Sequence, residues 1–136
     1  MEKLIKDAPL EDVLEMRREV MYPAFSIGQV RLKDDEEGNH QGLYVDDNLI
    51  AVISVFVRNN IMQFRKFATK EAFQGKGYGT ELLEYVMKLA KDRHCNSIWC
   101  NARVNAKKFY EKFGMQVTGD TWVQDGYEFI KMVKQL

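Results

Sequence analysis

The sequence predicts one α/β (α+β) domain over residues 1–136, in which a mixed, mostly antiparallel central sheet is flanked by helices. Two hairpin signals, one in each half of the chain, predict the antiparallel strands. Between them, a strand, an amphipathic helix and a second strand predict one parallel pair. With 46% apolar residues the chain can bury one core, and no repeat or linker divides it.

The first helix is predicted over residues 10–21, where apolar side chains recur at helical spacing. Pro23 ends it, and the polar segment 24–38 is predicted to be a loop or a short helix. Arg17 falls on the same inward face as the apolar residues. An inward arginine indicates either a buried ion pair or a group that binds a substrate carboxylate.

A hairpin is predicted over residues 43–57, because two apolar segments flank the turn signal Asp46-Asp47-Asn48. Its second strand, 49–57, is apolar throughout. We therefore expect that strand at the centre of the sheet, covered on both faces.

The next strand, 61–69, changes phase along its length. Met62 and Phe64 place the apolar side on even positions, but Phe67 places it on an odd one. This change predicts a β-bulge that frees backbone groups from the sheet, unless Phe67 faces a second buried layer.

The second half of the chain completes the sheet. An amphipathic stripe predicts a helix over 80–93, and alternation predicts a strand over 97–104. A short helix over 105–113 and a final hairpin of strands 115–123 and 127–133 follow.

A glycine-rich segment, Gln74-Gly75-Lys76-Gly77-Tyr78-Gly79-Thr80, directly precedes the helix 80–93. Glycines let the main chain approach an anion, and the unpaired N–H groups at the start of a helix attract one. The spacing matches neither a Walker loop nor a dinucleotide fingerprint. The segment is therefore either a pyrophosphate site of another kind or a tight connection.

Composition excludes several classes of partner. Twenty basic and twenty acidic residues cancel, so we expect neither nucleic acid nor a membrane as partner. The first residues include Glu2, Lys3 and Lys6 without a long apolar run, which predicts no signal peptide and a cytoplasmic protein. Cys95 and Cys100 are too few for a disulfide framework and have no standard zinc spacing, so no metal is expected.

An acidic run, Asp34-Asp35-Glu36-Glu37, lies in the polar segment 24–38. It is either a solvated loop or a face that attracts a cationic acceptor.

Three segments together resemble the Gcn5-related N-acetyltransferase (GNAT) family. Residues 74–79 match that family's Gln/Arg-x-x-Gly-x-Gly/Ala signature, and Lys66-Phe67-Ala68-Thr69 resembles its bulged fourth strand. Residues 105–115 resemble its Asn…Phe-Tyr…Gly-Phe segment, and residues 16–23 and 40–44 more loosely resemble a small bacterial branch. The order of predicted elements agrees with the acyl-CoA N-acyltransferase (GNAT) fold along nearly the whole chain.

The resemblance implies acetyl-coenzyme A (acetyl-CoA) as cosubstrate. Its pantetheine arm would pair with backbone groups of Phe67, Ala68 and Thr69, and Asn105 would hold the arm unless it is only a helix N-cap. Gln74 would shape the turn. The pyrophosphate would rest on the amides of Gly75, Lys76, Gly77, Tyr78, Gly79 and Thr80.

The resemblance also implies direct attack of an amine on the thioester. Tyr110 stands where the family has the acid that protonates the leaving thiolate, although a core tyrosine tethered by its hydroxyl is the alternative. The backbone N–H of Phe67 is expected to stabilise the oxyanion. Gln63 and Arg65 stand on the strand where many members have a carboxylate base, which leaves His40 as the candidate base.

The sequence therefore predicts an N-acetyltransferase that moves an acetyl group from acetyl-CoA to a primary amine of a small molecule or peptide. One alternative is a non-catalytic acyl-CoA-binding sensor or interaction module. Another is a nucleotide-binding protein, which the glycine spacing disfavours. A homodimer is one oligomeric state that the sequence allows.

Overall fold

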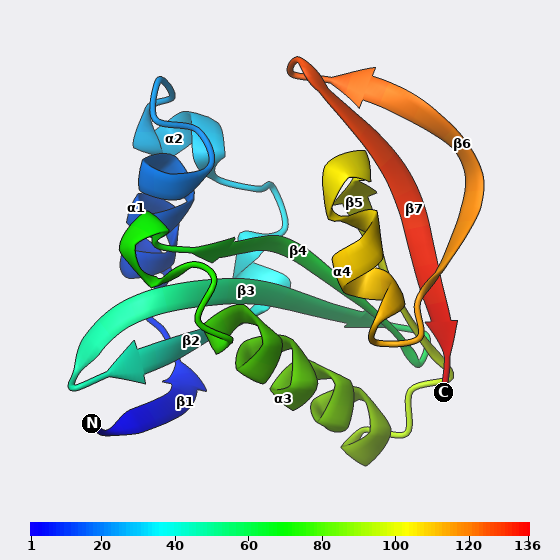
Figure 1. Ribbon diagram of the computed structural model, residues 1–136, viewed down its shortest axis with the longest axis horizontal. Coiled ribbons are helices and arrows are strands. Elements are labelled where there is room, and N and C mark those ends of the chain that lie inside the picture. The colour runs from blue at the N-terminus through cyan, green and yellow to red at the C-terminus, as the bar shows by residue number, and fades with distance from the viewer.

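A computed structural model describes residues 1–136 and contains one seven-stranded sheet (Figure 1). Its strand order is β1-β2-β3-β4-β5-β7-β6, and only β4 and β5 pair in parallel. The mixed, mostly antiparallel sheet predicted from the sequence is confirmed. The strands are β1 (Lys3–Asp7), β2 (Asn39–Val45), β3 (Asn48–Arg58), β4 (Ile61–Thr69), β5 (Ser97–Arg103), β6 (Gln116–Gln124) and β7 (Tyr127–Gln135).

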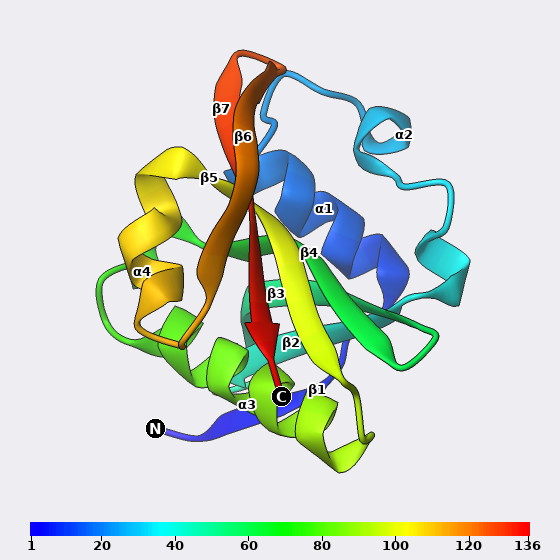
Figure 2. The ribbon, with the colours of Figure 1, turned by 90° about the vertical axis from the view of Figure 1, so that its right-hand side faces the viewer.

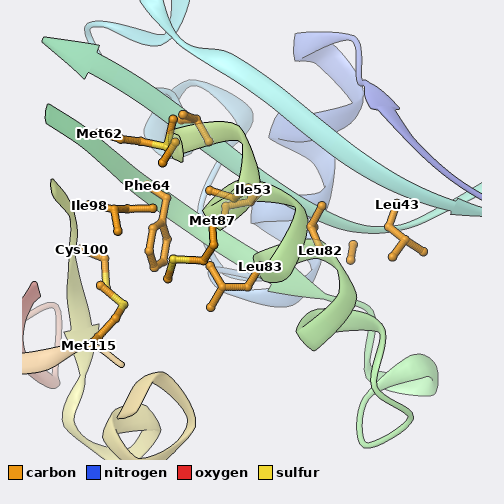
Figure 3. Close-up of a cluster of buried hydrophobic side chains, with 14 of the residues drawn as sticks. Leu43, Ile53, Met62, Phe64, Leu82, Leu83, Met87, Ile98, Cys100 and Met115 are labelled. Atoms are coloured by element: carbon orange, nitrogen blue, oxygen red, sulfur yellow. The ribbon is translucent and has the colours of Figure 1, made fainter. Parts of the chain in front are cut away.

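Two helices cover opposite faces of the sheet (Figures 1 and 2). The amphipathic α3 supplies Leu82 and Leu83 to the main core, where they meet Phe64 and residues of β2, β3 and β5 (Figure 3). On the other face, α1 packs Val13 against Val52. The helices are α1 (Leu10–Val20), α2 (Ile27–Val30), α3 (Tyr78–Asp92) and α4 (Lys107–Glu111).

The structure adds one strand that was not predicted and corrects two predicted helices. The strand β1 was not predicted, and it pairs with β2 at the edge of the sheet. The helix α3 begins at Tyr78 rather than at residue 80, so part of the glycine segment belongs to its first turn. The predicted helix 105–113 is a 3-10 turn, Val104–Ala106, followed by the five residues of α4. No helix is long and apolar enough to span a membrane.

The bulge in β4 is confirmed. Val52 of β3 pairs with Ala68 and Ser54 pairs with Arg65, so two residues of β4 face one residue of β3. One of the two, Lys66, has a φ of 54°, a left-handed conformation that non-glycine residues seldom adopt. A bulge of this kind increases the local twist of its strand and leaves backbone groups unpaired.

The two parallel strands separate just before the bulge. β4 pairs with β5 only at Ile61, Met62 and Gln63. From Phe64 onward β4 has no partner on its β5 side, while β5 continues to pair with β7 as far as Arg103. The sheet is therefore split between β4 and β5 near the carboxyl ends of both strands.

Candidate active site

A glycine loop borders one end of this split. Gly75 and Gly77 have φ values of 74° and 88°, and an added Cβ at either position would meet no atom within 4 Å. The backbone N–H groups of Gly75, Lys76 and Gly77 donate to no carbonyl. The next N–H groups belong to the first turn of α3, which has no intrahelical acceptor for them. The loop thus presents consecutive free N–H groups to open space.

Gln74 ties the loop to the end of β4. Its side-chain amide donates to the carbonyl of Thr69 over 2.9 Å. This bond fixes the direction in which the chain leaves the strand and enters the loop.

Three adjoining cavities form one cleft across the molecule. The loop cavity, of about 530 Å³, lies against the glycine segment and Phe73. The central cavity, of about 290 Å³, lies in the split and shares Phe67 and Thr69 with the loop cavity. The hairpin cavity, of about 590 Å³, reaches the β6–β7 hairpin and shares Lys66 and Asn101 with the central cavity.

Aromatic rings line the inner wall of the cleft. Phe67 of the bulge packs on Phe109 of α4 with ring centroids 6.2 Å apart, and Phe64 packs on Tyr110 at 5.7 Å. The Phe64 ring belongs to the main core (Figure 3). α4 is therefore held against the split by contacts with β4, and Tyr110 lines the central cavity.

Tyr110 keeps its proton at neutral pH. Burial raises the pKa of its phenol well above the usual value, and the nearby Cys100 raises it further, whereas Arg103 lowers it. The Tyr110 hydroxyl forms no hydrogen bond with another protein group, so the alternative of a tethered core tyrosine loses its support. A neutral phenol in the cleft can donate a hydrogen bond to a ligand.

Cys100 lies on the same wall of the central cavity. Burial raises the pKa of its thiol to about 12. The thiol is therefore protonated at neutral pH and is a poor nucleophile. Both cysteines are free and buried.

Arginines bind all four carboxylates of the acidic run, although Glu36 and Glu37 remain exposed to solvent. Arg17 is completely buried and forms two 2.8 Å hydrogen bonds with Asp35. Asp34 accepts from Arg58 at 2.8 Å and from Arg65 at 2.9 Å. Two exposed pairs complete the set, Arg31–Glu36 at 3.2 Å and Arg58–Glu37 at 3.4 Å. The run is thus an ion-pair network, and none of its four residues lines the three cavities.

His40 belongs to this network. Its Nε2 lies 2.8 Å from the carbonyl of Asp35 and its Nδ1 lies 2.7 Å from the hydroxyl of Ser54. Since a carbonyl only accepts, Nε2 donates to it, and Nδ1 is hydrogen-bonded to the Ser54 hydroxyl, whose oxygen accepts from Arg17. Both ring nitrogens are therefore engaged, and His40 lines none of the three cavities. The structure does not bring His40 together with Tyr110, and we do not assign it as the base.

Asn105 is also separate from the cleft. It is exposed and lines a fourth hollow beside the turn of the β6–β7 hairpin. It is not a side-chain N-cap either, because α4 begins after Ala106 and its cap has no side-chain hydrogen bond. Of this segment, Ala106 lines the loop and central cavities.

Two basic residues in the cleft were missed as site residues. Lys66 lines both the central and the hairpin cavities, and Arg103 lines the central cavity from β5. The phase change at Phe67 pointed to the bulge but not to the direction of the Lys66 side chain. For Arg103, only its place at the end of a strand, where ligands bind in such sheets, pointed to a role in the site.

The acetyltransferase (GNAT) domain family matches residues 11–136. The uncharacterized N-acetyltransferase YitI of Bacillus subtilis (strain 168) is 28% identical over 125 residues, which cover 85% of this chain and 84% of YitI. A crystal structure of a Lactobacillus plantarum protein assigned as an N-acetyltransferase is similar with a TM-score of 0.84 at 24% identity, covering 99% of this chain and 97% of that chain. A Bacillus subtilis acetyltransferase solved in complex with CoA is similar with a TM-score of 0.76 at 16% identity, covering 99% and 98%.

The seven-stranded sheet with its split between β4 and β5 is thus the fold of the N-acetyltransferases. Because the family match extends over nearly the whole chain, the protein belongs to the GNAT acetyltransferase family.

Proposed function

We propose that the protein transfers an acetyl group from acetyl-CoA to a primary amine while both substrates are bound. The continuous cleft carries this proposal. It runs from the glycine loop through the split to the β6–β7 hairpin, so two ligands that enter from opposite ends meet at the central cavity.

The glycine loop fits the pyrophosphate of acetyl-CoA. Free N–H groups of Gly75, Lys76 and Gly77, together with those of the first turn of α3, can donate to its oxygens. The open space above both positive-φ glycines leaves room for the group. The family relation and the CoA-bound structural neighbour support the same cosubstrate.

The unpaired edge of β4 fits the pantetheine arm. From Phe64 to Thr69 the backbone has no strand partner on the side of β5. The amides of the arm can form hydrogen bonds with the backbone of Phe67, Ala68 and Thr69 as an added strand would. This places the thioester in the central cavity, beside Tyr110.

The proposed reaction is a single displacement. The amine nitrogen forms a bond to the thioester carbonyl carbon, the carbon–sulfur bond breaks, and the sulfur leaves as a thiolate. The nitrogen loses one proton and the thiolate gains one, giving the amide and free CoA. The N–H of Phe67 stabilises the oxyanion, and the Tyr110 hydroxyl donates to the sulfur.

The ammonium form of the acceptor must lose a proton before it attacks. Neither carboxylate nor imidazole lines the central cavity. We therefore assign the deprotonation to solvent water, so that kcat/KM rises with pH up to the pKa of the acceptor itself.

Direct attack is favoured over a covalent acetyl-enzyme. Cys100 is the one thiol lining the central cavity, and its pKa of about 12 keeps it protonated. A nucleophilic cysteine needs a lowered pKa.

Release of the CoA thiol in the presence of a panel of primary amines tests the proposal. Turnover that depends on an added amine, with a thermal stabilisation by CoA larger than that by ATP or NAD, is the expected result. Tight CoA binding without turnover on any amine would instead favour the sensor. Stabilisation by ATP or NAD alone would favour the nucleotide-binding protein.

A further inference from the structure

The hairpin cavity is the space left for the body of the acceptor when the donor enters through the loop cavity and its thioester reaches the central cavity. Its volume of about 590 Å³ is in the range of sites for small organic molecules. Trp99 of β5 and Trp122 of β6 form part of its lining, and Trp122 stacks on Phe129 with ring centroids 5.9 Å apart. An apolar or aromatic body would bury its surface against these rings.

The charge of the cleft is positive where the two cavities meet. Three basic residues and no acidic residue line the central cavity. Arg65 is already bound to Asp34, but Lys66 and Arg103 take part in no ion pair. The only carboxylate lining the hairpin cavity is Asp125, in the β6–β7 turn.

Lys66 faces the cleft from β4. The bulge gives it a positive φ of 54°, and its ammonium group donates to the Tyr22 hydroxyl over 3.0 Å. It also lies 4.7 Å from the centroid of the Tyr22 ring. An ammonium group has three donors, so this contact leaves it free to bind an anion as well.

Arg103 faces the cleft from β5, on the opposite wall. Its guanidinium stacks over Tyr127 with 3.8 Å to the ring centroid. One terminal nitrogen of this group is buried and has no hydrogen-bond acceptor. A buried donor without an acceptor costs about 1–3 kcal/mol, and a ligand oxygen that reached this nitrogen would remove that cost.

We propose that the acceptor is an amine that also carries a carboxylate, and that Lys66 and Arg103 bind this carboxylate from the two walls of the split. The proposal rests on the acetyl transfer proposed above and names its acceptor class, an amino acid with an apolar or aromatic side chain. The carboxylate bridges the two free cations, the side chain packs on the tryptophans, and the amine remains within the central cavity. Polyamines and other polycations are disfavoured as substrates, because the central cavity is lined by three basic residues and no acidic one.

The test compares acceptors that differ in one group. L-phenylalanine, its amide and phenethylamine form one series, and leucine with its amide and isopentylamine forms another. We expect kcat/KM to be at least about tenfold higher for an amino acid than for its amide or amine, since each charge-assisted hydrogen bond contributes roughly that factor. In Lys66→Gln and Arg103→Gln the KM of the amino acid should rise about tenfold, with kcat and the KM of the plain amine close to wild type.

Lys88→Gln is the matched control, because Lys88 is exposed on α3 and should leave every constant unchanged. Equal turnover of amino acid, amide and amine would overturn the proposal. So would an Arg103→Gln variant whose kcat falls equally for all acceptors, because that result would assign Arg103 to the leaving thiolate.

A binding experiment separates this proposal from the proposed transfer. 3-Phenylpropionate and 4-methylpentanoate carry the carboxylate but no amine, and calorimetry measures their binding to the CoA-saturated protein. We expect binding of at least one of them to wild type and Lys88→Gln, and about tenfold weaker binding to Lys66→Gln and Arg103→Gln. This pattern without turnover on any amine would refute the transfer and keep the anion site, whereas no binding of either carboxylate to wild type would refute the anion site itself.

Discussion

Replacement of Asp35 by Asn tests the buried ion pair on which α1 and the acidic run depend. Arg17 and Asp35 have no exposed side-chain surface, and Arg17 donates to Asp35, to Ser54 at 2.9 Å and to the carbonyl of Val30 at 3.1 Å. Asp35→Asn keeps the shape but leaves the Arg17 charge buried without its counter-ion. Removing one partner of such a pair costs about 3–5 kcal/mol.

The expected loss is large for a domain of this size. Since each kcal/mol lowers the Tm by about 3–5 °C here, the Tm should fall by about 10–25 °C. Urea unfolding followed by circular dichroism at pH 7 measures the free energy directly. Glu36→Gln is the control, because the side chain of Glu36 is 85% exposed and its pair with Arg31 should contribute at most about 1 kcal/mol.

The effect should also depend on pH in a definite direction. Burial alone raises the pKa of Asp35, but hydrogen bonds from Arg17 and from the N–H of Leu32 outweigh it and hold the pKa below its usual value. A lowered pKa in the folded state stabilises the protein above the unfolded pKa of about 3.9, and this contribution disappears as the pH falls through the folded pKa. The difference between wild type and Asp35→Asn should therefore shrink in acid. An Asp35→Asn variant within about 1 kcal/mol of wild type at pH 7, which is the contribution of an exposed ion pair, would refute the reasoning.

Two further predictions concern the cleft. Gly77→Ala forces alanine into a φ of 88° at a cost of about 1–2 kcal/mol, and it should weaken CoA binding by about tenfold in calorimetry. Gly28→Ala is the control, because Gly28 lies in α2 at a negative φ and alanine there should lower neither stability nor CoA affinity. Equal CoA affinity of the two variants would contradict the role of the loop. Cys100 should resist iodoacetamide at pH 7 in the folded protein, because a pKa of about 12 leaves only about one thiol in 10⁵ ionised. Mass spectrometry locates the label, and fast labelling of Cys100 would contradict the burial of its thiol.

The periodicity of apolar residues in the sequence was sufficient to predict most strands of the sheet. β4 was predicted with its observed bounds, and the bulge was one of the two explanations that the sequence left open for its change of face. β1 was missed because only Ile5 of its five residues is partly buried, so it carries no apolar alternation. Its position is determined by the free edge of β2, which no local pattern reveals.

The candidate site was less predictable, because its charges are paired over long sequence separations. Asp34 and Asp35 meet arginines that lie 31 and 18 residues away, and the acidic run by itself gives no sign of them. The same network occupies His40, whose type alone suggested a base. In contrast, the glycine loop and Tyr110 were predicted from the order of residues within short segments of the sequence, and both line the cleft.

The Tyr110→Phe variant tests the central claim, that the cleft is the site of acetyl transfer, most directly. Its CoA-thiol release, measured with an amine that wild type acetylates, is to be compared with its affinity for CoA. Phenylalanine retains the ring packing on Phe64 but lacks the hydroxyl, so we expect kcat to fall by about 10²-fold or more while the Kd for CoA and the Tm stay close to wild type. Unchanged turnover in Tyr110→Phe would contradict the account.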